Sequence, residues 1–453
     1  MKAPQIREKG AMAVKHGIRE RILRLRRDPR NLFYLISAAG ILLYFLLSLR
    51  WGGQLYAWMV QENAPEIRFV DYFSHLADAV DRTALYQHFS ANETATYLPL
   101  FPPLAYCMYH LLFRLTAVPD APPEGTRAAE AVPGALSVFT IFLIFTAVLF
   151  FLGISLTGKS SRKKDLAIFT LLMLSAVFGG SGYMTGNSAM LVLALLMLGL
   201  HLTDSSGALR REAGLLLLAV CVALKIYPAV FGLVLLKEKK YRELVRFILY
   251  SLLLLFVPFV FFGGLSALQA WAANLFYPLA SSDFGRLQYL KGIFFTLIRI
   301  LTGREEPLFS TALSAAVCLL WVWLAWRSRS RQRTLFFLTC VMVFFPSNSF
   351  RYTLAYFAVP LVLLLKEDPE PGLRARPAAL LSGLYGLLYT VPVWWLLVLP
   401  IGRRFTVHTL TSVEIWLYLA AYTLVAVMMF LELRAGWPGR KRAGASSPSP
   451  EKA

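Results

Sequence analysis

Long apolar runs separated by short polar loops recur along most of this 453-residue chain. Hydrophobic residues make up 57% of it, and its mean hydropathy is +0.57. In lipid, a chain of this kind satisfies its backbone hydrogen bonds by forming helices. Many runs approach the length that an α-helix needs to cross a bilayer. The sequence therefore predicts an all-α, polytopic transmembrane helix bundle of about 11 spans, plus or minus about two, with interfacial helices in its extracytoplasmic loops.

Polar and basic segments around these runs set the predicted domain organisation. Residues 1–30 hold ten Lys and Arg and form a basic tail that we expect in the cytoplasm. No Pro-, Gly- or Ser-rich linker of domain length interrupts residues 31–433, which we predict to be one membrane-embedded domain. Its first extracytoplasmic loop covers residues 51–96, and residues 434–453 form a short basic C-terminal tail.

The positive charge of the chain reflects membrane topology and not nucleic-acid binding. The formal net charge is +20, but Lys and Arg are concentrated in the tails and in short loops between apolar runs, as the positive-inside rule describes. We therefore expect membrane lipids as partners and no nucleic acid. The four cysteines lie inside apolar runs without a CxxC spacing, which is typical of small core residues.

The topology between residues 98 and 165 has two solutions. Apolar runs at 98–117 and 134–156 precede a strongly basic loop at 158–165. Two full crossings after an external loop would place that basic loop outside, so either one run does not cross fully or the positive-inside preference is broken once. We favour an incomplete crossing, because Pro99, Pro102 and Pro103 suit a regular membrane helix poorly.

The segment after the first run is acidic and has the pattern of an amphipathic helix. Its apolar positions recur at the spacing of one helix face: Phe69, Phe73, Leu76 and Val80. Polar residues repeat that spacing on another face: Asp71, His75, Asp78 and Arg82. An acid on an interfacial helix can face lipid-borne substrate on one side and water on the other. We select Asp71 as the catalytic candidate and interpret Asp78 as an acid on the wet side.

Two cations lie within or at the edge of apolar runs. Lys225 belongs to Lys-Ile-Tyr-Pro at 225–228, and Arg351 follows Phe350. A cation in the bilayer costs about 2.5–3.5 kcal/mol on insertion scales, so each should face a polar cavity or an anion. The alternative is snorkelling to the interface. Lys225 can snorkel to the interface only if Pro228 breaks its helix. Two half-helices that meet at residues 225–228 would also keep the basic loops on both sides of this run in agreement with the positive-inside rule.

Polar residues beside the helix breaks and in the external segments are weaker pocket candidates, since polar residues at helix ends are commonly caps. These candidates are His75, Tyr97, Asn187, Tyr227, Arg286, Lys291, Asn348 and Tyr352.

Several of these segments, taken in chain order, resemble one family. The segments are the acidic loop with Asp71, the Tyr-Leu-Pro at 97–99, Gly186-Asn187 heading a run, the Ala-Leu-Lys-Ile-Tyr-Pro at 223–228, and the stretches 274–291 and 345–352. Together they resemble the bacterial polyprenyl-phosphate-mannose-dependent mannosyltransferases of the C-type glycosyltransferase fold. The family commonly has glutamine at the position of Asn187, and its Ser-rich external motif is only partly present near Ser281.

The resemblance implies an enzyme that transfers a sugar, mannose or another hexose or a pentose, from a polyprenyl-phosphate donor to a glycan or lipid-linked acceptor. It implies a bacterial plasma membrane, with the reaction at the extracytoplasmic face and Asp71 as general base. Lys225 and Arg351 would hold the donor phosphate. Transfer with one base and no second nucleophilic carboxylate inverts the anomeric carbon. A divalent metal, Mg²⁺ or Mn²⁺, would serve the same phosphate, although no ligand cluster in the sequence demands one.

The alternative function is a transporter or flippase for a polyprenyl-linked or anionic lipid. Such a protein would also carry buried cations, broken helices and basic lipid contacts. Inverted internal repeats would favour it, and none is evident in the sequence.

Overall fold

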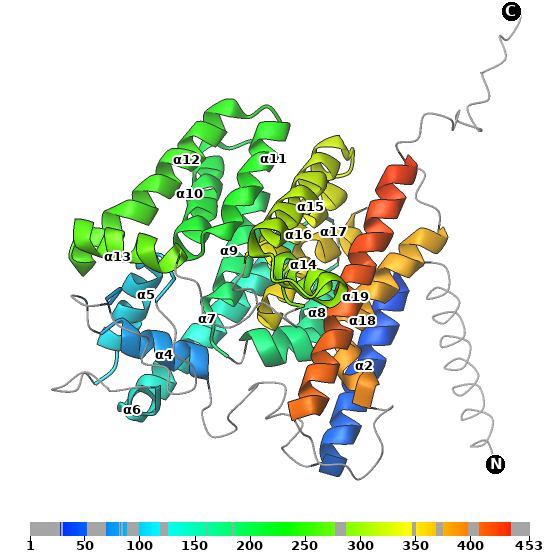
Figure 1. Ribbon diagram of the computed structural model, residues 1–453, viewed down its shortest axis with the longest axis horizontal. Coiled ribbons are helices and arrows are strands. Elements are labelled where there is room, and N and C mark those ends of the chain that lie inside the picture. The colour runs from blue at the N-terminus through cyan, green and yellow to red at the C-terminus, as the bar shows by residue number, and fades with distance from the viewer. Residues whose placement is uncertain are drawn as a thin grey trace, which may run out of the picture.

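The computed structural model describes residues 28, 30–51, 69–80, 82, 85–87, 99–117, 126–159, 161–183, 185–276, 287–346, 350–367, 375–396 and 407–435. The two predicted tails, apart from Asp28 and Arg30 at one end and Arg434 and Ala435 at the other, and most of the first loop lie outside these residues. Within the described residues every regular element is helical (Figure 1).

Five described segments are long and apolar enough to cross a membrane. They are the first 19 residues of α2 (Asn31–Trp51), α7 (Ala135–Leu156), α12 (Tyr241–Phe256) continued by η3 (Val257–Phe262), α15 (Pro307–Arg327) and the C-terminal part of α19 (Val407–Ala435). The predicted all-α membrane architecture is confirmed to this extent, and the larger span count stays a prediction.

The other apolar runs form shorter or interrupted helices. These are α5 (Pro103–Arg114), α8 (Arg162–Met173) with the π-helical η1 (Ala176–Tyr183), α9 (Ser188–Leu202), α10 (Ala208–Leu224), η2 (Tyr227–Phe231) with α11 (Gly232–Lys237), α16 (Arg331–Phe344), η4 (Arg351–Phe357) with α17 (Ala358–Lys366), and α18 (Ala375–Leu396). Four helices lie outside the long runs: α4 (Val70–Asp78), α6 (Thr126–Ala131), α13 (Leu265–Phe276) and α14 (Leu290–Thr302).

The break predicted at Lys-Ile-Tyr-Pro is present. α10 ends at Leu224, and Lys225 is extended, with φ −151° and ψ 122°. A short 3₁₀ turn with Pro228 in its first turn follows and leads into α11. Proline lacks the N–H that would continue an α-helical ladder, so the chain changes direction here.

α5 is too short to cross a bilayer by itself. It has 12 residues, which corresponds to a length of about 18 Å, well short of the roughly 30 Å hydrocarbon core of a bilayer. Just beyond its C-terminus, the Ala117 N–H donates to the Pro133 carbonyl at 3.1 Å, so the chain returns beside the start of α7. This geometry supports the topology in which the run at 98–117 does not cross the membrane fully, because α7 then begins on the same side as α4.

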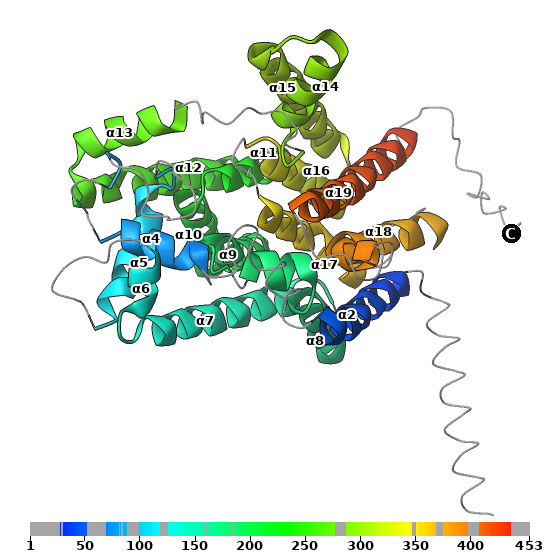
Figure 2. The ribbon, with the colours of Figure 1, turned by 60° about the horizontal axis from the view of Figure 1, so that its bottom comes forward.

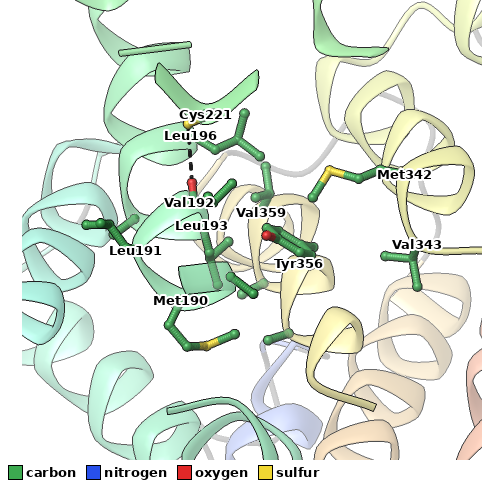
Figure 3. Packing of buried hydrophobic residues seen from close by; sticks show 14 of the residues in the cluster. Met190, Leu191, Val192, Leu193, Leu196, Cys221, Met342, Val343, Tyr356 and Val359 are labelled. Carbon is green, nitrogen blue, oxygen red and sulfur yellow. Dashed lines mark hydrogen bonds between the residues drawn. The ribbon is translucent and has the colours of Figure 1, made fainter. Parts of the chain in front are cut away.

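α9 is the centre of the bundle. In Figure 2 it lies between α7 on one side and α10 and α12 on the other. Its buried side chains Met190, Val192 and Leu193 meet η4 and α17 in a continuous apolar core (Figure 3), which includes Tyr356 and Val359. Every residue of α9 from Ser188 to Ala194 is buried, so the N-terminus of α9 is placed rigidly.

Small residues allow α2 and α18 to pack closely. A Cβ at Gly40 would lie 2.5 Å from the Thr390 Cβ, and one at Gly386 would lie 3.0 Å from the Ile36 Cβ. Contacts between small residues are how helices approach one another in lipid, where no hydrophobic force drives them together.

The end of α11 lies at the end of the bundle opposite α4 and α6 (Figure 1), and charged side chains join neighbouring helices there. The Lys237 ammonium donates to the carbonyls of Ala325 at 2.7 Å and Ser328 at 2.6 Å and so caps α15. Lys366 pairs with Asp165 at 2.8 Å. These residues belong to the basic loops that the sequence predicts to be cytoplasmic.

Candidate active site

α4 carries Asp71 and begins with a strained residue. Phe69, the N-cap residue, is left-handed with φ 57° and ψ 36°. For a residue with a Cβ this conformation costs about 1–2 kcal/mol and persists only where the surroundings hold it. The Phe69 ring is held against Phe139, with ring centroids 4.6 Å apart. Asp71 follows in the first helical turn and is half-buried.

Asn187 binds Asp71 directly. The Asn187 Nδ2 donates to the Asp71 Oδ2 at 2.9 Å, and the Asn187 Oδ1 accepts from the Ala189 N–H at 2.9 Å as the N-cap of α9. Thus Asn187 is both a helix cap and a member of the site. One backbone bond joins the same two segments, since the Tyr72 N–H donates to the Thr185 carbonyl at 3.2 Å.

Gly186 makes this approach possible. Its φ is +69°, and a Cβ there would lie 2.6 Å from the Phe139 ring and 2.7 Å from the Tyr72 Cβ. Only glycine adopts this conformation without strain and leaves that space empty. The loop before α9 therefore lies directly against α4.

Lys225 lies in an aromatic cage. Its side chain is on the extended residue between α10 and η2, and the residue is only 3% exposed. The ammonium is 4.1 Å from the centroid of the Phe101 ring, 5.2 Å from that of Tyr352 and 5.9 Å from that of Tyr227. Cation–π contacts of this kind partly offset the loss of water. Within the described part of the chain, no side chain forms an ion pair with this ammonium.

Tyr352 links the lysine to the acid. It is the second residue of η4, its ring faces the Lys225 ammonium, and it lies within electrostatic range of the Asn187 side chain. The Asp71 carboxylate acts electrostatically on both Tyr352 and Lys225. Asp71, Asn187, Tyr352 and Lys225 thus form one continuous cluster, which comes from four separate parts of the chain.

His75 packs behind this cluster among aromatic rings. Its imidazole lies 4.4 Å from the Phe101 ring and 5.3 Å from the Tyr109 ring. Asp78 approaches the same imidazole at 3.8 Å and is buried. The interpretation of Asp78 as an acid on a wet face was therefore wrong, because α5 covers the side of α4 that the sequence pattern assigns to water.

The remaining candidates have different positions. Tyr227 flanks Lys225 and meets the Tyr356 ring at 5.9 Å. Arg351 is half-buried at the start of η4, next to Tyr352, and Lys291 is half-buried in the first turn of α14. Tyr97, Arg286 and Asn348 lie outside the described residues.

Two aromatic residues of α5 and the segment before it are part of the site although the sequence did not single them out. Phe101 supplies the ring nearest to Lys225, and Tyr109 lies within electrostatic range of Asp71. An aromatic residue in an apolar run has no sequence signal that distinguishes these roles from lipid contact.

The described residues contain no group of three or more His, Cys, Asp and Glu that could hold a metal ion. The cluster offers a carboxylate with one oxygen held by an amide, within electrostatic range of a caged cation. That combination suits the removal of a proton beside a developing negative charge.

A sequence model described as glycosyltransferase family 87 matches residues 125–349. The matched segment contains Asn187 and Lys225, whereas Asp71 and Arg351 lie outside it. Searches of curated proteins and of solved structures found no match. The match indicates a membrane glycosyltransferase, in agreement with the class expected from the sequence, and the mannosyltransferase subfamily stays a prediction.

Proposed function

We propose that this protein is an inverting glycosyltransferase that uses a polyprenyl-phosphate sugar, mannose or another hexose or a pentose, at the extracytoplasmic face of a bacterial plasma membrane. The acceptor is a glycan or a lipid-linked saccharide. One observation carries the proposal: the acid of α4 and the buried lysine after α10 belong to the same cluster, in which Asn187 binds Asp71, the Tyr352 ring faces Lys225, and Asp71 acts electrostatically on Lys225.

In the proposed reaction, Asp71 accepts the proton of the acceptor hydroxyl while the hydroxyl oxygen attacks the anomeric carbon of the donor sugar. The bond between that carbon and the phosphate oxygen breaks, and the polyprenyl phosphate leaves with the electron pair. Lys225 stabilises the negative charge of the departing phosphate, and Arg351 is the second cation proposed for it. Asp71 then releases its proton to water. A single displacement inverts the anomeric configuration.

The family match supports a transferase over a transporter or flippase, because it concerns glycosyltransferases. The position of α4 supports the extracytoplasmic face. It lies at the end of the bundle opposite the basic loops with Lys237 and Lys366 (Figure 1), and basic loops are typical of the cytoplasmic side.

The test is sugar transfer by the purified protein from a labelled polyprenyl-phosphate sugar. We expect Asp71→Asn to lower kcat by about 10³-fold or more, as loss of a general base does. The fold should be intact, because an asparagine oxygen can still accept the hydrogen bond from Asn187. The matched control is Asp78→Asn on the same helix, for which we expect near-normal turnover. Wild-type turnover in Asp71→Asn would reject Asp71 as the base.

A further inference from the structure

The hydrogen bond from Asn187 to Asp71 has a defined direction. α9 occupies the amide oxygen, because the Asn187 Oδ1 accepts from the Ala189 N–H at 2.9 Å. The amide nitrogen must then point toward the Asp71 Oδ2, also at 2.9 Å. A flipped amide would lose the helix cap and place an oxygen against the carboxylate. The orientation of this side chain is therefore set by the helix that it caps.

The surroundings keep this amide in place. Asn187 is 2% exposed, so bulk water does not compete for its donor. The residue before it is Gly186, which lies against Tyr72 and Phe139. The residue after it, Ser188, is fully buried. Since α9 is the centre of the core, Asn187 presents a fixed donor to a carboxylate on a short peripheral helix.

We propose that Asn187 is a positioning residue for the general base. It holds the Oδ2 of Asp71 and directs the other carboxylate oxygen toward the acceptor hydroxyl. This inference rests on the proposed function, because it assigns a role relative to Asp71 as base. It differs from a capping role alone, in which any good N-cap residue would serve equally well.

The substitution that separates the two roles is Asn187→Ser. Serine caps helices about as well as asparagine, but its shorter side chain cannot reach Asp71 while it caps α9. We expect the thermal midpoint to stay within about 3 °C of wild type and kcat to fall about tenfold or more, the effect of one hydrogen bond to a charged group. We expect the KM for the donor to change by less than about threefold, since uniform binding is kept.

A second readout does not respond to a purely structural role. If Asn187 only caps α9, any loss of activity in Asn187→Ser should follow the loss of folded protein, whereas the positioning role lowers kcat per folded molecule and leaves the donor KM unchanged.

Activities of the two variants distinguish the positioning role of Asn187 from the proposed role of Asp71 as general base. Wild-type kcat per folded molecule in Asn187→Ser, together with an inactive Asp71→Asn, would overturn the positioning role and leave the transferase mechanism standing. Full activity of Asp71→Asn would instead remove the base itself. Asn187→Ala completes the set. It removes both the cap and the donor, so it should match Asn187→Ser in kcat and in addition lose thermal stability.

Discussion

Lys225 is the residue with the clearest conflict between stability and function. An ammonium this deeply buried loses its water, and the rings of Phe101, Tyr352 and Tyr227 replace that water only partly. In the described part of the chain no carboxylate forms an ion pair with it. Unfavourable burial of this kind is typical of sites that receive an anionic ligand, because the ligand supplies the missing partner.

We therefore predict opposite effects for Lys225→Met. Methionine has a similar length and no charge, so the thermal midpoint without donor should stay the same or rise, since a buried charge costs about 2.5–3.5 kcal/mol in lipid. The KM for the polyprenyl-phosphate donor should rise about tenfold or more. Thermal unfolding with and without donor, together with steady-state kinetics, measures both effects. Lower stability with unchanged donor KM would contradict a donor-binding role.

At the scale of elements, every residue of the cluster lies where a helix starts, ends or breaks. Asp71 is in the first turn of α4 and Asn187 caps α9. Lys225 follows α10, and Tyr352 is in the first turn of η4. In a membrane protein, non-helical backbone at depth is tolerated only where it is buried in protein or lines a polar cavity. These interruptions are therefore the places where polar side chains can converge.

The junction between α4 and α9 depends on Gly186, and we predict that Gly186→Ala separates them. The added Cβ meets Tyr72 and Phe139 at less than 3 Å, and the positive φ adds strain. We expect a stability loss of about 1–3 kcal/mol, typical of overpacking, and at least a tenfold fall in kcat. The matched control is Gly303→Ala between α14 and α15. Its φ of +70° gives similar strain with nothing within 4 Å, so kcat should stay normal. Equal kcat in both variants would show that the junction does not support catalysis.

For the whole molecule, one end of the helix bundle holds the candidate active site and the other end stabilises the bundle. The end with α4 carries the cluster, and the opposite end is held by buried charge pairs. Arg333 pairs with Glu432 at 2.8 Å, which joins α16 to α19. Lys366 pairs with Asp165 at 2.8 Å and also donates to the Ile154 carbonyl at 2.5 Å, which joins α17, α8 and α7.

We predict that breaking the second pair affects stability without affecting catalysis. Lys366→Ala leaves the buried Asp165 without its lysine, which should lower the free energy of unfolding by about 3–5 kcal/mol. The double variant Lys366→Ala with Asp165→Asn should recover part of that loss. Thermal unfolding and kcat per folded molecule are the measurements. A fall in kcat at equal folded amounts would mean that this end also controls the active site.

The orientation of the bundle gives a prediction at the same scale. In cells with the protein in its native membrane, a membrane-impermeant maleimide should label Arg82→Cys, near α4, and should not label Arg242→Cys in the first turn of α12. Both positions are exposed. Background labelling should be low, because three native cysteines are buried and Cys107 is half-buried. Labelling of residue 242 alone would place α4 in the cytoplasm and contradict the proposed extracytoplasmic reaction.

The sequence by itself determined the all-α membrane class, the positions of the long helices and the break at Lys-Ile-Tyr-Pro. Each of these depends on local length, apolarity and proline, and lipid enforces them segment by segment. The selection of Asp71 and Lys225 came from the same local reasoning, since an acid on an amphipathic helix and a cation in an apolar run are visible without a fold.

Only the tertiary structure decided which of these residues meet. The Asn187 bond to Asp71, the Phe101 ring over Lys225, the burial of Asp78 and the short course of α5 all join segments far apart in the chain. An aromatic ring or a polar helix cap has the same sequence pattern whether it faces lipid, another helix or a buried cation. Its role is set by the packing of the whole bundle around α9, which no single segment encodes.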